Sequence, residues 1–183
     1  FSLKDEEAAL EMECKVSSRG YYPFRTTPEQ LQEFESSPAK VDTFFHEQMH
    51  KVLEQWMQLA DERLAESGKR CYVCPGNDDS SDTDDVIKRA KHVHLAEGKV
   101  VELGDGFSMI STGWTNITPW KTFRELPEDQ LAAKIESIIP HQSEMSKTIF
   151  NFHCPPYGSG LDEAPEIDRN LHIKNAGQSL VPV

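Results

Sequence analysis

The apolar residues of the first part of the chain recur at three- and four-residue spacing, which is the period of one face of a helix. The longest run of this kind predicts a helix over about residues 39–66. Its apolar positions are Val41, Phe45, Met49, Val52, Trp56, Leu59 and Leu64. Residues 1–14 are typical of a short helix, and Thr27-Pro28 is a helix start that predicts a second helix to about Phe34. Gly68 follows the long helix as its C-terminal cap. Residues 1–69 are therefore expected to be largely helical.

Beyond residue 69 the pattern changes to short apolar runs that are typical of β-strands. These runs predict strands over 70–74, 92–96, 99–103, 107–112 and 147–152. Helices are expected over about 82–90 and from Pro127 to about Ile139, and the final thirty or so residues as mostly loop. Gly104-Asp105-Gly106 predicts a hairpin turn, which makes the sheet mixed. The fold class is therefore α/β, with residues 1–183 forming a single domain whose α/β part is 70–183.

Charge and hydropathy narrow the choice of function. The 183 residues carry 19 basic and 31 acidic side chains, a net charge of −12, which disfavours binding to a long nucleic acid. No apolar run approaches the roughly 20 residues of a membrane span, and the acidic N-terminus lacks the pattern of a signal peptide. We therefore expect a cytoplasmic protein with no membrane partner. The oligomeric state stays open.

Polar side chains stand at the carboxyl ends of two predicted strands. The strand 70–74 runs into Pro75-Gly76, which is followed by Asn77, Asp78 and Asp79, and the strand 147–152 is followed directly by His153. In open α/β sheets, ligands and metals bind at this edge. Taken singly, however, Asn77 is more typical of a turn, and His153 of a histidine that is hydrogen-bonded within the fold.

Several other residues allow competing interpretations. Cys71 and Cys74 have the spacing of a metal or redox pair, but they lie in a predicted strand and have no second pair to complete a site, which favours free thiols. The histidines of His92-Val93-His94 could be read as part of a metal motif, but they also lie in a predicted strand, which argues against that interpretation. Aromatic residues on predicted loops are equally typical of substrate contacts and of packing; they are Trp114, Trp120 and Tyr157.

The two strand ends together resemble a known family. Pro75-Gly76-Asn77-Asp78, followed later by Asn151-Phe152-His153-Cys154-Pro155-Pro156, is similar to the calcineurin-like metallophosphoesterases. This resemblance implies an αββα sandwich with mixed sheets and two divalent metal ions, such as Mn, Fe or Zn. It implies that Asn77 and His153 are metal ligands. It also implies hydrolysis of a small phosphorylated substrate, a phosphomonoester or phosphodiester, by a water that the metals activate.

The chain departs from the family pattern in two ways. Many members have histidine at the position of Asp78, so we expect Asp78 to be a neighbouring active-site group that positions a ligand or water. The Asp-x-His, Gly-Asp-x-x-Asp and Gly-His-x-His motifs are absent. We therefore expect an internal segment of a longer protein, in which Phe1 is not the natural start. We expect little or no activity from the segment alone. The alternative is a non-catalytic scaffold or interaction domain with a degenerate metal site.

Overall fold

The computed structural model describes residues 5–139, 145–164 and 181–182. Contacts divide the chain into two compact units, Phe1–Trp56 and Met57–Val183. Each unit is described by itself, and the single-domain organisation stays a prediction. None of the helices in these described ranges is both long enough and apolar enough to cross a membrane.

The first unit is built from helices whose starts are set by local side chains. They are α1 (Glu6–Ser17), α2 (Pro28–Ser36) and the greater part of α3 (Pro38–Leu64). The Asp5 carboxylate caps α1 by accepting a hydrogen bond from the Ala8 N–H, and the Thr27 hydroxyl caps α2 by accepting from the Gln30 N–H. The predicted helix starting at Thr27-Pro28 and the predicted long helix are both confirmed, the latter within two residues at its ends.

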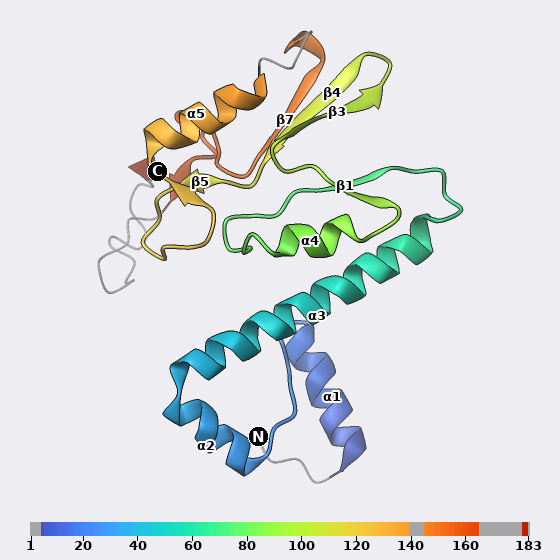
Figure 1. Cartoon of the computed structure of the whole chain (residues 1–183), viewed down its shortest axis with the longest axis vertical. Coiled ribbons are helices and arrows are strands. Elements are labelled where there is room, and N and C mark those ends of the chain that lie inside the picture. Colours follow the sequence, from blue (N-terminus) through green and yellow to red (C-terminus); the bar gives the residue numbers. More distant parts are fainter. Residues whose placement is uncertain (1–4, 140–144, 165–180, 183) are drawn as a thin grey trace. The chain divides into compact units, whose positions relative to one another are not determined.

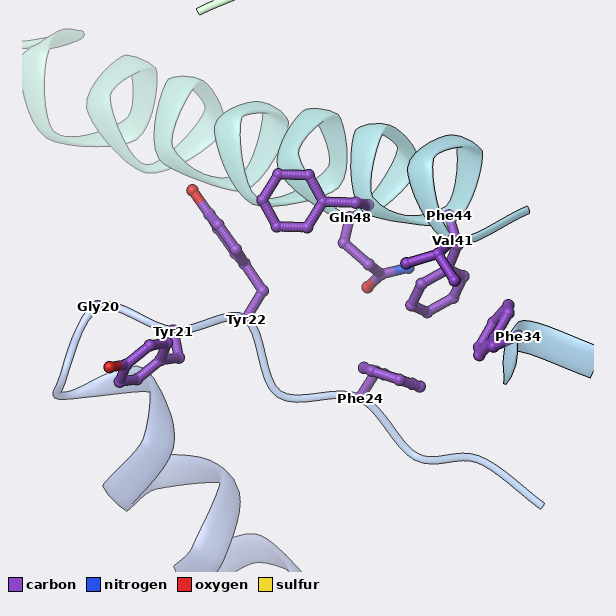
Figure 2. Close-up of a pocket in the computed structure, with 9 residues that line it drawn as sticks. Gly20, Tyr21, Tyr22, Phe24, Phe34, Val41, Phe44 and Gln48 are labelled. Atoms are coloured by element: carbon purple, nitrogen blue, oxygen red, sulfur yellow. The ribbon is translucent and has the colours of Figure 1, made fainter. Parts of the chain in front are cut away.

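Aromatic side chains hold the first unit together. The ring of Phe24, on the connection between α1 and α2, packs against Phe44 of α3 with centroids 4.6 Å apart. Phe34 of α2 contacts both of these rings. The rings border an apolar groove of about 400 Å³ between the connection, α2 and α3, which Figure 2 shows. Val41 and Phe45, two positions of the predicted apolar stripe, line this groove.

The second unit contains the last part of α3 and, within the described ranges, all the strands. In chain order its further elements are β1 (Cys71–Val73), α4 (Thr83–Lys88), β2 (Val93–Leu95), β3 (Lys99–Gly104), β4 (Phe107–Thr112), β5 (Thr115–Asn116), β6 (Glu125–Leu126), α5 (Glu128–Ile138), the 3₁₀ turn η2 (Met145–Lys147), β7 (Thr148–Phe152), β8 (Glu163–Ala164) and β9 (Val181–Pro182). Each predicted strand and helix of this part is present to within two residues. The short strands β5 and β6 fall outside the predicted strands. The prediction for the final residues lies mostly outside the described ranges.

The strands form small sheets, of which one is mixed. β3 and β4 are an antiparallel hairpin, and β7 pairs with the other edge of β4 in parallel, so the order is β3-β4-β7 (Figure 1). β1 and β2 are parallel, as are β5 and β6, whereas β8 and β9 are antiparallel. The α/β class with mixed pairing is thus observed.

The core of the second unit lies where α4 packs against β2. Val86 and Ile87 of α4 are buried, as are Val93 and Leu95 of β2. Ile110, at the centre of β4, is completely buried. Since alternate residues of β2 are buried and exposed, the strand presents one face to the core and His94 to solvent.

The ends of three strands meet at one place because their backbones approach closely. Gly113 follows β4 and lies against Pro75, which follows β1. A Cβ atom at Gly113 would stand 1.6 Å from the Pro75 carbonyl oxygen, so no larger residue fits. The His153 N–H, directly after β7, donates to the Thr112 carbonyl at 2.9 Å. The carboxyl ends of β1, β4 and β7 are thereby adjacent.

The substitution Gly113→Ala tests this close approach. We expect it to lower the free energy of unfolding by at least about 3 kcal/mol, because the new methyl group overlaps a backbone atom that cannot move alone. Urea denaturation measures the effect. Gly98→Ala is the control, since Gly98 has a positive φ of 64° but open space around it, and should cost only about 1–2 kcal/mol. Equal stability of the two variants would contradict the predicted overlap.

Candidate functional site

A tight turn follows β1 and sets the position of Asn77. The Asp79 N–H donates to the Gly76 carbonyl at 3.2 Å, and the Gly76 N–H donates to the Asp79 carboxylate at 2.7 Å. The turn therefore closes on Asp79 rather than on Asp78. A Cβ atom at Gly76 would lie 3.2 Å from Cε1 of the His153 ring, so a larger residue would require the ring to shift slightly.

The turn brings Asn77 to His153, which is 76 residues further along the chain. The Asn77 Oδ1 atom lies 2.8 Å from the His153 Nε2 atom. An amide oxygen only accepts hydrogen bonds, so Nε2 carries the hydrogen in this arrangement. The His153 side chain is exposed, and its backbone is held by the bond to Thr112. Two of the three predicted site residues are thus in direct contact.

Asp78, the third predicted site residue, stands at the exposed corner of the same turn. The small pocket beside His153 is lined by other residues. It has a volume of about 160 Å³ and is bordered by Cys74, Pro75, Thr112, Asn151, Phe152 and His153. The active-site role of Asp78 stays a prediction.

Buried Arg124 holds the loop that follows the turn. Its guanidinium group donates to the backbone carbonyls of Asp79 and Ser80 at 2.7 and 2.8 Å, and to the Asp84 carboxylate at 2.7 Å. Only 3% of Arg124 is exposed. Buried carbonyl groups need hydrogen-bond donors, and a single arginine supplies them across this loop. The Arg124 N–H also donates to the Asn77 carbonyl at 3.0 Å.

The Glu125 carboxylate forms hydrogen bonds with both Thr118 and Thr122 and so stabilises the loop between them. It accepts from both backbone N–H groups at 3.0 Å and from both hydroxyl groups. Burial raises the pKa of Glu125, but the hydrogen bonds from Thr118 and Thr122 together outweigh this effect and hold the pKa at about 2. The Thr122 hydroxyl also accepts from Nδ2 of Asn77 at 2.9 Å.

A second carboxylate, Glu97, ties the ends of β1 and β4 together. It accepts hydrogen bonds from the Gly113 N–H at 2.6 Å, the Thr112 hydroxyl at 3.3 Å and the Cys74 thiol at 3.4 Å. Burial, together with the negative charge of Glu97, raises the pKa of the Cys74 thiol to about 12. Cys74 therefore stays protonated at neutral pH and is a poor nucleophile or metal ligand. Cys71 and Cys74 are both free and half-buried.

The loop after His153 is closed by its own carboxylate. Asp162 is 2% exposed and accepts from the N–H groups of Gly158 and Gly160 at 2.6 and 3.0 Å. The hydrogen bond from Gly158 is the main reason that the pKa of Asp162 lies below its ordinary value. The loop carries Tyr157, which is 82% exposed, and Leu161, which is 78% exposed.

The sequence left two interpretations open for further residues, and these lie in different surroundings. They are His92, His94, Trp114 and Trp120. Lys134 stands 4.8 Å from the Trp114 ring centre, a cation–π contact that engages Trp114 in packing, whereas Trp120 is largely exposed. The rings of His94 and Tyr72 are in contact across β1 and β2. The backbone N–H groups of Lys91 and His92 donate to the Asp61 carboxylate. His94 thus packs against β1, whereas the backbone at His92 is tied to Asp61 of α3.

Asn77 and His153 bring two possible metal-donor atoms together. An amide oxygen and an imidazole nitrogen are donor atoms that Mn, Fe and Zn accept. The 2.8 Å between them is a hydrogen-bond distance, so an ion would have to replace this hydrogen bond to reach both atoms. Nε2 has to lose its hydrogen before it can act as a ligand, since only the neutral ring with a free lone pair binds.

Comparison with known proteins finds a distantly similar protein. Over 115 residues, which are 61% of this chain, the chain is 28% identical to the uncharacterized protein MJ1162 of Methanocaldococcus jannaschii. The chain spans about half the length of this relative, as the match covers 49% of it. No known family profile matches the chain, and no solved structure matches it significantly.

The pH dependence of stability tests the role of Glu125. Glu125→Gln should cost about 1–3 kcal/mol at neutral pH, because an amide cannot accept all four hydrogen bonds. The unfolded chain takes up this proton near pH 4.3, and the folded chain only near pH 2. The stabilisation by Glu125 is therefore complete above about pH 5 and falls as the pH drops toward about 2.

Urea unfolding of wild type and Glu125→Gln at a series of pH values measures this difference. We expect the gap between the two free energies of unfolding to narrow as the pH falls below 5. A gap that stays constant over that range would show that the ionised carboxylate is not what holds the Thr118–Thr122 loop.

Proposed function

We propose that the chain is part of a metal-dependent phosphoesterase that resembles the calcineurin-like metallophosphoesterases. The observation that carries the proposal is the 2.8 Å approach of Asn77 Oδ1 to His153 Nε2 where the ends of β1 and β7 meet. In enzymes of this kind, two divalent ions bind a phosphate group and activate water for attack on phosphorus. The αββα sandwich, the two ions and a cytoplasmic location belong to the same proposal.

The residues of this chain would have distinct tasks in such a site. Asn77 would supply a neutral oxygen ligand, and His153 would supply a nitrogen ligand from the end of β7. Gly76 leaves space for the His153 ring, so the turn and the ring can stay close. Asp78 stands at the exposed corner of the turn, where it can position water or part of a substrate. The net charge of −12 favours a small phosphorylated substrate over a long nucleic acid.

A second candidate function is a non-catalytic scaffold or interaction domain. The observation that favours it is the same hydrogen bond, because Asn77 and His153 satisfy one another as structural residues do. The two candidates differ in what happens when His153 is removed. An enzyme loses metal affinity, whereas a scaffold loses only stability.

The substitution His153→Ala separates these candidates. We expect the full-length protein to bind about two Mn²⁺ ions, and His153→Ala to weaken at least one of them by more than about tenfold, since a lost ligand costs more than a lost supporting residue. Equilibrium dialysis with Mn²⁺ measures both quantities. His94→Ala, at an exposed histidine of β2, is the matched control and should bind Mn²⁺ like wild type. Unchanged binding by His153→Ala would rule out the metal site.

The role of Asp78 is tested separately by Asp78→Asn. We expect turnover of an activated phosphodiester by the full-length protein to fall roughly 10- to 100-fold, as a misplaced water or substrate would produce, while Mn²⁺ binding is retained. Asp105→Asn is the control, because Asp105 lies in the β3-β4 turn with a φ of 53° that asparagine also adopts. If Asp78→Asn turned over the diester at the wild-type rate, Asp78 would have no part in the reaction.

A further inference from the structure

The amide group of Asn77 is held from the side opposite His153. Its Nδ2 atom donates to the Thr122 hydroxyl at 2.9 Å, and that hydroxyl donates to the Glu125 carboxylate at 2.7 Å. Four side chains therefore form one continuous hydrogen-bonded chain, which runs from Glu125 to His153 Nε2. Thr122 and Glu125 lie 45 or more residues from Asn77 in the sequence, and no motif points to them.

We propose that Thr122 and Glu125 are positioning residues that fix which end of the Asn77 amide faces His153. The inference rests on the proposed function, in which Oδ1 of Asn77 is a metal ligand. In the part of the chain that the structure describes, neither Thr122 nor Glu125 hydrogen-bonds to the His153 ring. They act through Asn77 alone.

The direction of the chain of hydrogen bonds follows from the chemistry of its last member. An ionised carboxylate only accepts hydrogen bonds, so the Thr122 hydroxyl has to give its single hydrogen to Glu125. The hydroxyl oxygen then has only lone pairs to offer, and the amide end that faces it has to be the Nδ2 donor. The Oδ1 end consequently points to His153. A flipped amide would place two acceptors, Oδ1 and the hydroxyl oxygen, against each other.

The backbone of Asn77 is fixed independently of this chain of hydrogen bonds. Its carbonyl oxygen accepts from the Arg124 N–H at 3.0 Å, and the turn around it is closed by Asp79. Loss of the Thr122 hydroxyl therefore frees the amide to rotate without releasing the turn. This separation allows orientation to be tested apart from stability.

The experiment compares three variants at two threonines. Thr122→Val keeps the shape of the side chain and removes the hydroxyl group, and Thr122→Ser keeps the hydroxyl group. Thr118→Val is the matched control, because the Thr118 hydroxyl also bonds to Glu125, whereas Nδ2 of Asn77 donates to the Thr122 hydroxyl. Two quantities are measured in each protein: the dissociation constant for Mn²⁺, and the ¹⁵N chemical shifts of the His153 ring without metal.

We expect Thr122→Val to weaken Mn²⁺ binding about 10- to 100-fold, the usual loss when a residue supporting a metal ligand is removed. Without metal, its His153 ring should change from the form with hydrogen on Nε2 to a mixture of the two neutral forms, because Nδ2 then faces the ring part of the time. Thr122→Ser and Thr118→Val should match wild type in both measurements.

Two results would overturn the inference. One is wild-type Mn²⁺ affinity together with wild-type ring shifts in Thr122→Val. The other is an equal change in Thr118→Val, which would show a general loosening of the loop. If wild type itself binds no Mn²⁺, the proposed function fails, whereas the ring shifts still decide whether Thr122 orients the amide.

Discussion

The second unit depends on the backbone of Gly113 lying directly against the carbonyl group of Pro75. Where a Cβ atom would stand 1.6 Å from an oxygen, only glycine is possible. This approach joins the end of β1 to the end of β4, and Glu97 secures both by bonding to Gly113 and Cys74. β7 is paired with β4, with Thr112 opposite Phe152, so the His153 ring lies against Gly76. Backbone packing therefore brings Asn77 and His153 next to each other, and the orientation of their side chains then sets the 2.8 Å distance between Oδ1 and Nε2.

Local patterns were enough to predict most of the helices and strands. The apolar stripe of α3, the Thr27-Pro28 start of α2 and the glycines of the β3-β4 turn each carry their information within a few residues. β5 and β6 could not be predicted in this way, since each has two residues and exists only through its pairing with the other. The placement of Asn77 and His153 at strand ends was also readable, because both follow apolar runs.

The residues that support the site could not be identified from the sequence alone. Arg124 bonds to carbonyl groups 44 and 45 residues earlier, and nothing in the surrounding residues marks it as buried. Glu97 and Glu125 look like ordinary surface carboxylates, yet each collects hydrogen bonds from groups that only the folded chain brings together. Asp78 and Asp79 are chemically alike in sequence. Only the turn geometry shows that Asp79 closes the loop and leaves Asp78 in solvent.

In the loop from Pro155 to Asp162, the groups that fix the backbone are not the side chains that are exposed at the surface. The shape of the loop comes from the buried Asp162 carboxylate and two backbone N–H groups, none of which involves the side chains of Tyr157 or Leu161. Both of those side chains are more than three-quarters exposed. Evolution can therefore exchange the residues at the tip without disturbing the loop or the adjacent histidine.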